Sequence, residues 1–289
     1  MKSLLFKVDT VDKVFLLLDF FARQGETWIF RGQANSKWPL ETSLERAFKK
    51  FKLTDKNARY AAERHIIEMG DRVLCQYRDI SSLIKDKLDL LAFIQHFGGV
   101  TRLLDFTDSF PVALFFASES ASDSDFDVSV WCLRRDELRR DNINLRNRDK
   151  RREFASQILE CGLEMDSVIA FAPSVLNARL YAQQGLFVMP CSFEKSLADL
   201  LACVLQTDLP ANENSESDLG DLNVDSKNAV LLKFDVDKNI LRDVLVALRK
   251  LNVSADHLFP DITGICRSLS LLASGYRLNK DKFDIRGEL

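Results

Sequence analysis

The sequence predicts one α+β domain built on a mixed β-sheet with helices packed around it. Runs of β-branched and aromatic residues alternate with amphipathic segments, but they follow no strict β-α-β period. Of the 289 residues, 46% are hydrophobic and 29% are charged, with only 11 glycines and 6 prolines, which is typical of a folded chain. The irregular alternation favours a mixed sheet over a doubly wound parallel one.

In the first third of the chain, apolar spacing predicts helices around one strand. Residues 11–23 carry apolar side chains at helical spacing, and the hydrophobic run after them predicts a strand that ends at Phe30. Longer amphipathic segments predict helices over 57–77 and 83–97, the second ended by a glycine pair, as helix C-caps often are. We expect the first helix to pack on the outside of the sheet.

The rest of the chain alternates short strands with helices. A strand is predicted over 101–106, and Thr107 or Asp108 can cap the apolar helix that follows, with Pro111 tolerated in its first turn. The remaining expected elements are strands over 128–133, 167–171, 185–190 and 229–236, and helices over 174–183, 238–251 and 261–274.

Two segments stand apart by their charge. Residues 134–152 hold nine basic and four acidic side chains, so they form either a solvated helix and loop or a surface that contacts an anion such as RNA. Residues 208–226 are acidic and rich in turn formers, and we expect a mobile surface loop there.

Bulk properties exclude several classes of protein. The net charge of -3 does not favour general attraction to nucleic acid or membranes. Six scattered cysteines without a CxxC pair and three distant histidines argue against a metal site. No signal peptide or membrane-spanning run is evident, so we expect a reduced, cytoplasmic protein.

The stretch 95–117 concentrates polar residues among strongly apolar neighbours. On a strand, Thr101 and Asp105 share one face while Arg102 lies on the other, so Arg102 and Asp105 are not expected to pair. A buried charge needs a partner, because leaving it alone costs about 3–5 kcal/mol. Arg31, next to the opening strand, is therefore a candidate partner for Asp105.

The alternative is that the arginines hold an anionic ligand. The guanidinium fork suits phosphate or carboxylate, and Gly32 would let a ligand approach the backbone. Arg31 and Arg102 would bind the anion, with hydroxyls from Thr42, Ser43, Thr101 and Thr107 around it. His96 fits a local hydrogen-bonding role better than catalysis. The sequence holds no GxSxG, P-loop, HExxH or GxGxxG motif.

Five motifs, in order along the chain, resemble the FRG domain family: "WIFRGQ", "LETSL", "FIQHFGGVTRLLDFTDSFPVALFFA", "ARLYAQQGLFVMP" and "HLFPDITGI". Phe30-Arg31-Gly32 is the triplet for which the family is named. The resemblance spans about residues 25–270 and implies a single FRG-type domain over 1–289. The family consists mostly of uncharacterised bacterial and phage-associated proteins, so it implies a role in bacterial conflict with phage.

A second resemblance is to the ADP-ribosyltransferase fold. Phe30-Arg31-Gly32 is similar to the element that binds the phosphates or amide of NAD, and Thr107 stands in the place of the hydroxyl that holds the ribose. That fold implies a split, mixed β-sheet flanked by helices. Where a glutamate is expected, this chain has Gln183 or Gln184, and a neutral amide cannot offset cationic charge as a carboxylate does.

The resemblances imply a cleft and a set of site residues. NAD would be the substrate, with no metal, in an effector or toxin with transferase or glycohydrolase activity; the alternative is a non-catalytic sensor of a nucleotide, a nucleic acid or a partner protein that the sequence does not identify. The expected catalytic residues are Arg31, Thr107 and Gln184. The expected ligand-binding residues are Gly32, Gln33, Thr42, Ser43, His96, Thr101, Arg102, Asp105, Phe116 and Gln183.

Overall fold

The computed structural model describes residues 2–24, 28–74, 76–77, 83–121, 125–139, 148–174, 177–209, 219, 222 and 229–270. The strands are β1 (Lys2–Val8), β2 (Trp28–Gln33), β3 (Leu104–Thr107), β4 (Val128–Arg134), β5 (Val168–Phe171), β6 (Gly185–Pro190) and β7 (Ala229–Val236). The α-helices are α1 (Val11–Arg23), α2 (Ser43–Lys50), α3 (Lys56–Leu74), α5 (Lys87–His96), α6 (Phe110–Ser120), α7 (Arg148–Cys161), α8 (Ala178–Ala182), α9 (Leu197–Leu205), α11 (Leu241–Lys250), α12 (Ala255–Leu258) and α13 (Ile262–Ser270). Two short 3-10 helices are η1 (Glu137–Arg139) and η4 (Lys238–Ile240).

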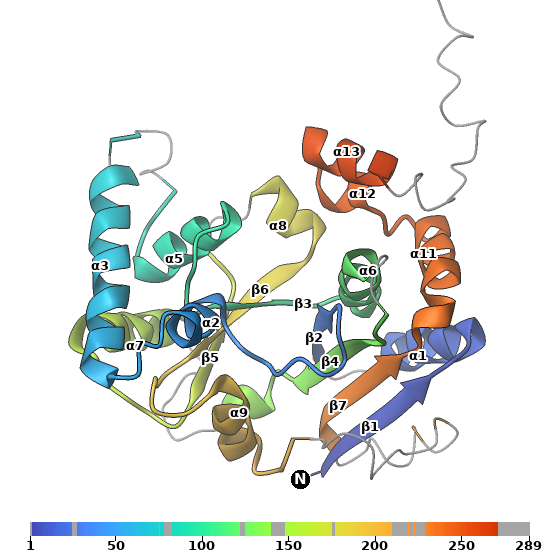
Figure 1. Cartoon of the computed structure of the whole chain (residues 1–289), viewed down its shortest axis with the longest axis horizontal. Helices are drawn as coiled ribbons and strands as arrows, with labels where there is room; N and C mark the ends of the chain where they lie inside the picture. The colour runs from blue at the N-terminus through green and yellow to red at the C-terminus, as the bar shows by residue number, and fades with distance from the viewer. Residues whose placement is uncertain are drawn as a thin grey trace, which may run out of the picture.

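Within these residues the strands form one seven-stranded sheet (Figure 1). The strand order is β1-β7-β4-β2-β3-β6-β5. β1 runs parallel to β7, and the other neighbours are antiparallel. The sequence-based expectation of an α+β fold with a mixed sheet is therefore confirmed. None of the described helices is both long enough and apolar enough to cross a bilayer.

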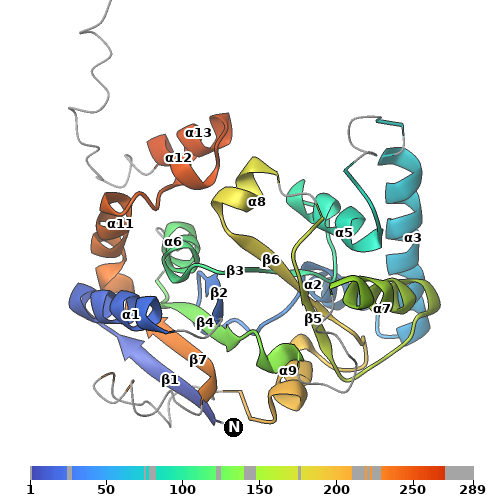
Figure 2. The same cartoon turned by 180° about the vertical axis from the view of Figure 1, so that it is seen from behind.

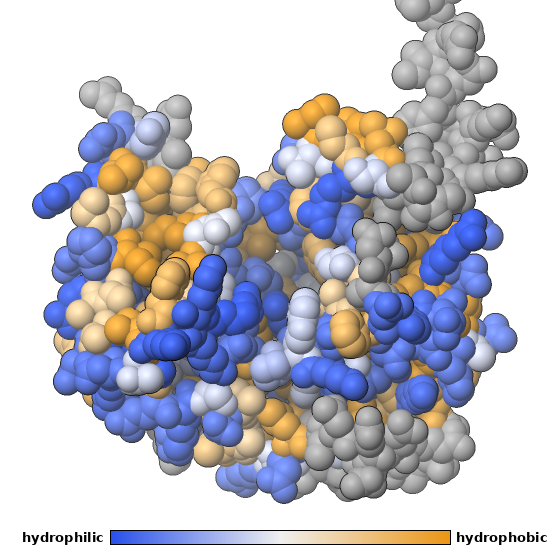
Figure 3. Space-filling model, in the orientation of Figure 1, coloured by the Kyte–Doolittle hydropathy of each residue, from blue (hydrophilic) through white to orange (hydrophobic). Residues whose placement is uncertain are grey.

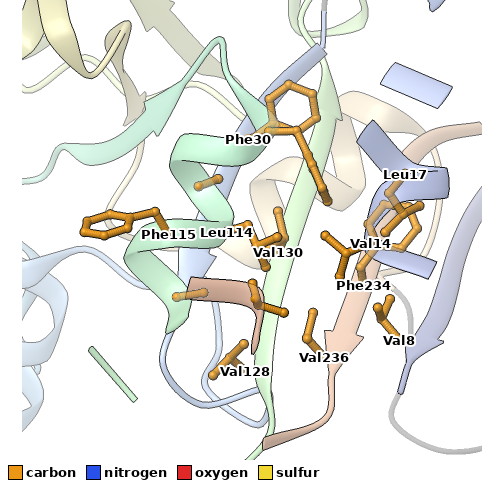
Figure 4. Close-up of a cluster of buried hydrophobic side chains, with 14 of the residues drawn as sticks. Val8, Val14, Leu17, Phe30, Leu114, Phe115, Val128, Val130, Phe234 and Val236 are labelled. Atoms are coloured by element: carbon orange, nitrogen blue, oxygen red, sulfur yellow. The ribbon is translucent and has the colours of Figure 1, made fainter. Parts of the chain in front are cut away.

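One face of the sheet carries two separate groups of helices. α1, α6 and α11 cover β1, β7, β4 and β2, and their apolar side chains form one cluster (Figure 4). α3, α5 and α7 cover β5 and β6 through a second cluster. Both groups lie on the same face, because Phe30 is opposite Thr107 and Asp105 is opposite Phe187 in the ladders. Figure 2 shows the two groups at opposite ends of the sheet.

The other face of the sheet is covered mainly by α9. Its leucines pack on residues that alternate with those of the first face, including Ile29, Leu104 and Leu186. A capping box between Ser196 and Asp199 starts this helix.

The sheet is nearly divided in two between β2 and β3. β2 pairs with β4 along six residues, and β3 pairs with β6 along all four of its residues. Between β2 and β3, the described ladder consists of the single pair Phe30 and Thr107. Beyond that pair the two strands separate, so a gap opens at the point where Arg31 follows Phe30.

Several elements differ from the sequence-based expectation. The strand expected over 101–106 is β3, three residues later at its start, because Thr101 hydrogen-bonds to the beginning of α2 instead of a neighbouring strand. The N-cap of α6 is Ser109, not Thr107 or Asp108. β1, α2, α9 and α12 were not expected, and α7 begins within the basic segment 134–152.

The two charged segments lie only partly within the described residues. Of the acidic segment 208–226, the structure describes 208, 209, 219 and 222; the expectation of a mobile loop concerns residues outside the described part. Of the basic segment 134–152, the structure describes the end of β4, η1 and the first turn of α7.

Candidate functional site

A pocket of about 330 Å³ lies where β2 and β3 separate. β2, β3 and β6 form its floor, and the ends of α5, α6, α8, α12 and α13 form its walls. Figure 3 shows the molecular surface hollowed between the α5 side and the α13 side. We call this cavity the arginine pocket, because Arg31, Arg179 and Arg267 all line it.

The Phe30-Arg31-Gly32 motif lies in the floor of this pocket, and its three residues have different roles. Phe30 is buried in the core against Phe21 and Phe110, with ring centroids 4.8 and 5.7 Å away. Gly32 lies directly under α6: a Cβ atom there would be 2.0 Å from the Ala113 carbonyl oxygen. Phe30 and Gly32 thus fix the strand against the helix and leave Arg31 to extend into the gap.

Arg31 bridges the gap but does not use all its donors. Its Nη1 donates to the Asp105 carbonyl oxygen at 2.8 Å, while the Asp105 carboxylate is 3.9 Å away. The Arg31 side chain is 19% exposed, and its Nε is buried with no hydrogen-bond partner. Burial, and secondarily Arg46, lowers the pKa of Arg31, whereas Asp105 opposes the shift. The guanidinium is therefore poorly solvated and incompletely paired.

Arg179 and Arg267 face the pocket from its outer wall. Their guanidinium carbons lie 4.4 and 4.0 Å from the ring centroid of Phe259. Arg267 also forms a bidentate ion pair with Glu119. Among the described residues, no carboxylate lies within ion-pair distance of Arg179. Burial, followed by the charge of Arg267, lowers the pKa of Arg179.

These contacts give the pocket an excess of positive charge. Its lining holds three arginines and, among the described residues, one carboxylate, that of Asp105. Asp105 is 64% exposed on the pocket wall. An anion entering this pocket would meet guanidinium groups that are already partly desolvated, which strengthens charge-assisted hydrogen bonds.

Thr107 fastens the floor of the pocket to α8. Its hydroxyl donates to the Gln183 carbonyl oxygen at 2.7 Å and accepts from the Ser109 amide at 3.0 Å. The Gln183 side chain donates to the Leu258 carbonyl oxygen at 3.1 Å, which connects α8 to α12. Thr107 and Gln183 both line the pocket, as do Gly32 and Phe116.

Gln184 does not join Arg31 and Thr107. Its backbone is left-handed, with φ 47°, and its side chain is exposed. It lines a different cavity, beside Trp28, Asp108 and Arg135. At the turn between α8 and β6, Gln183 therefore lines the arginine pocket, whereas Gln184 lines the other cavity.

Other expected ligand residues bond within the fold, away from the pocket. Arg102 is fully enclosed (0% exposed); its Nε donates to Glu63 Oε1 at 2.5 Å, and Nη2 contacts the other oxygen. Arg102 therefore pairs with the carboxylate of Glu63, and the expectation that it binds an anionic ligand is wrong. The remaining residues have these partners: Thr42 caps α2, Ser43 bonds to the backbone of Thr101, the Thr101 hydroxyl bonds to Gln95, and Gln33 bonds to Trp131 and to the Pro39 carbonyl oxygen.

His96 lies on the pocket wall at the end of α5. Its Nε2 is 3.5 Å from the amide nitrogen of Asn177. Burial, followed by the charge of Arg179, lowers the pKa of His96, while Asp261 and Asp105 oppose the shift. The imidazole is therefore neutral at pH 7, so it can exchange a hydrogen bond without adding charge.

Three arginines of the basic segment have partners within the fold. Arg134 lies over the Trp28 ring at 5.2 Å, and Arg135 pairs with Asp108 at 3.2 Å. Arg152 binds Asp86 and Asp89. Residues 140–147 lie outside the described part of the chain.

Fold and site together define an α+β protein whose mixed sheet opens into an arginine-lined pocket. Residues 26–126 match the family model of the FRG domain, which supports the FRG family. The matched part includes β2, β3 and α6, and hence Arg31, Gly32 and Thr107. α8, α12 and α13, which complete the pocket, lie beyond it. No curated protein and no solved structure matches the chain, so the resemblance to the ADP-ribosyltransferase fold has no support from these comparisons.

Among the pocket residues that the sequence-based site left out are Arg179, Phe259 and Arg267. Arg179 and Phe259 stand in the motifs "ARLYAQQGLFVMP" and "HLFPDITGI", so the family resemblance already marked their segments. Arg267 had no such signal, because its place in the wall depends on how α13 folds back over α6.

Proposed function

We propose that the chain binds an anionic ligand of the nucleotide class in the arginine pocket. The observation that carries the proposal is Arg31, which lines the pocket together with Arg179 and Arg267 and whose buried Nε has no hydrogen-bond partner. A buried unsatisfied donor costs about 1–3 kcal/mol, and a phosphate oxygen would supply the missing acceptor. Five phenylalanines line the same pocket, which suits the flat parts of a nucleotide.

Ligand binding by purified protein tests this proposal. NAD, ADP-ribose and inorganic pyrophosphate are titrated against the unmodified chain, Arg179→Ala and the control Arg23→Ala. Arg23 is exposed, pairs with Asp19 and does not line the arginine pocket. We expect at least one ligand to raise the melting temperature, because binding to the folded state alone stabilises it by about 2.7 kcal/mol at one hundred times Kd. Arg179→Ala should weaken binding and Arg23→Ala should not. No binding by any of the three ligands would contradict the proposal.

A second candidate function is cleavage of NAD in the same pocket, as in an ADP-ribosyltransferase or glycohydrolase-like effector. Asp105 favours it, because this exposed carboxylate on β3 lies in the pocket with Thr107 and supplies the negative charge that Gln184 lacks. The bond between ribose C1 and the nicotinamide nitrogen would break with its electron pair leaving on nicotinamide. Water or an acceptor hydroxyl would then add to C1 and lose its proton.

Release of nicotinamide distinguishes the two candidates. If the chain turns NAD over, Asp105→Asn should abolish release of nicotinamide while NAD still binds. If NAD binds and no nicotinamide appears, the chain acts by binding alone, as a nucleotide sensor. A role in conflict between bacteria and phage rests on the family resemblance, and either form of the proposal is compatible with it.

A further inference from the structure

We propose that the arginine pocket continues past His96 into an apolar compartment, and that the two together accept a dinucleotide, with its pyrophosphate at the arginines and one base in the apolar compartment. This inference rests on the proposed function and specifies the ligand of the same site. The apolar compartment is a cavity of about 430 Å³ between α5, α8 and the segment after β5. Its apolar lining includes Ala92, Phe93, Phe97, Pro173, Leu180 and Phe187.

The two cavities share a wall of three side chains. His96, Leu180 and Phe187 line both the arginine pocket and the apolar compartment. The two cavities are therefore neighbours, and a ligand that reaches past these side chains would occupy both. The charge of one cavity and the apolar lining of the other match the two chemically different parts of a single molecule.

The lining of the compartment suits an uncharged aromatic ring. Phe93 and Phe97 lie with ring centroids 4.8 Å apart, and Phe187 is 5.7 Å from Phe171. Rings at these separations stack with, or pack edge-on to, a further ring. The one carboxylate among its described lining residues, Asp89, already binds Arg152 and the Ser174 amide. The apolar compartment therefore has no unpaired carboxylate among its described lining residues to bind a charged group.

Polar groups at the entrance suit the edge of a base. His96 and Asn177 lie together there, with the amide nitrogen 3.5 Å from Nε2. Asn177 Oδ1 is used, since it accepts from the Leu180 amide at 2.7 Å and caps α8. The Asn177 amide nitrogen and the His96 imidazole thus offer hydrogen-bonding groups to the exocyclic groups or ring nitrogens of a base.

Cavity size also favours a ligand that occupies both cavities. Ligand sites commonly measure about 300–1,000 Å³. The arginine pocket alone is near the lower limit, at about 330 Å³, and the apolar compartment at about 430 Å³ adds room for a further ring system. A dinucleotide such as NAD has the required order of parts, with a pyrophosphate between two flat bases.

Two variants alter the apolar compartment without touching the arginine pocket. Phe93→Ala removes a ring from its wall, and Ala92→Leu fills part of its volume; neither residue lines the arginine pocket. Kd is measured by titration calorimetry with NAD and with inorganic pyrophosphate. Phe51→Ala is the matched control, because that ring is exposed on the surface after α2.

We expect each compartment variant to raise the Kd for NAD by about 5- to 150-fold, which is the effect of losing one stacked base. The Kd for pyrophosphate should stay within about twofold in both. Arg179→Ala should weaken the binding of both ligands, and Phe51→Ala should change the binding of neither. An unfolded variant would no longer bind pyrophosphate, so the pyrophosphate titration also shows whether each variant is folded.

Three results would overturn the inference. If NAD binds and depends on Arg179, but neither compartment variant weakens it, the base lies elsewhere and only the proposed function stands. If a long-chain alkyl phosphate binds more tightly than NAD and Phe93→Ala removes the difference, the compartment takes an alkyl chain instead of a base. If neither NAD nor pyrophosphate binds the unmodified chain, the proposed function itself fails and this inference with it.

Discussion

Arg31 and Arg102 lie in different surroundings, although the sequence assigned both to the same anion. Arg102 is enclosed with Glu63, whereas Arg31 lines a pocket and its buried Nε has no hydrogen-bond partner. Strand alternation predicted that Arg102 and Asp105 would not pair, and they do not, although Arg102 lies before the start of β3. It could not identify Glu63, which lies 39 residues earlier on α3 and becomes buried only when that helix packs on the sheet.

The buried pair of Arg102 and Glu63 gives a stability prediction. Glu63→Ala should lower the free energy of unfolding by about 3–5 kcal/mol, because it leaves an enclosed guanidinium without its anion. Urea denaturation measures this change. Glu68→Ala is the control, since Glu68 is an exposed carboxylate on the same helix. Equal effects of the two substitutions would show that Arg102 does not depend on Glu63.

The position of His96 leads to a prediction about how the affinity for NAD depends on pH. Arg179, Asp261 and Asp105 are the charged groups that act on it, and in the free protein burial and Arg179 hold its pKa below the ordinary 6.5. A bound anion favours the imidazolium and raises that pKa, so a proton is taken up on binding. The affinity for NAD should therefore increase as pH falls from about 8 to about 5.5.

Calorimetry across that range checks the pH prediction. His96→Gln, which keeps a polar side chain but cannot take up a proton, should flatten the dependence. A flat profile for the unmodified chain would mean that His96 does not sense the anion.

At the scale of elements, the contact of α6 with β2 sets the position of the pocket floor. Gly32 allows this contact, because a Cβ atom would meet the backbone of α6 at Ala113 and at Ala117, 2.0 and 2.8 Å away. Backbone atoms inside a packed helix cannot move aside as a flexible side chain can. The glycine of the Phe-Arg-Gly motif is thus a packing requirement that also places Arg31.

Gly32→Ala should therefore destabilise the chain by more than the about 1–3 kcal/mol typical of overpacking. Gly70→Ala is the matched control, because the nearest atom to its Cβ would be the end of the flexible Ile94 side chain, at 2.9 Å, and alanine favours the helix. Chemical denaturation of both variants measures the difference. If Gly32→Ala is as well tolerated as Gly70→Ala, α6 does not press on β2 as described.

Elements with a strong periodic pattern were predicted well from the sequence. α1 has the expected bounds, and β6 and β7 match the expected strands. α2 was missed, although its capping box of Thr42 and Glu45 is visible in the sequence, because Thr42 was assigned to a ligand. β1 was missed because its place depends on pairing with β7, more than two hundred residues later.

At the scale of the whole molecule, the arginine pocket depends on two features of the sheet. β2 and β3 are joined by a single residue pair, and the two parts of the sheet on either side of it are covered by separate groups of helices. The lining of the pocket runs from Phe30 to Arg267, and so combines segments from both ends of the chain. The sequence predicted the floor, with Arg31 and Thr107 on neighbouring strands. It could not predict the outer wall, because the positions of α8, α12 and α13 depend on tertiary packing, nor the turn that directs Gln184 away.

A crystal structure of the chain with bound ADP-ribose would show directly whether Arg31 binds a ligand. We predict a phosphate oxygen within hydrogen-bond distance of Arg31 Nε, about 2.7–3.2 Å, and Arg179 on the same pyrophosphate. ADP-ribose bound outside the arginine pocket, with Arg31 Nε still unpaired, would contradict the account and leave Arg31 as a structural bridge across the sheet.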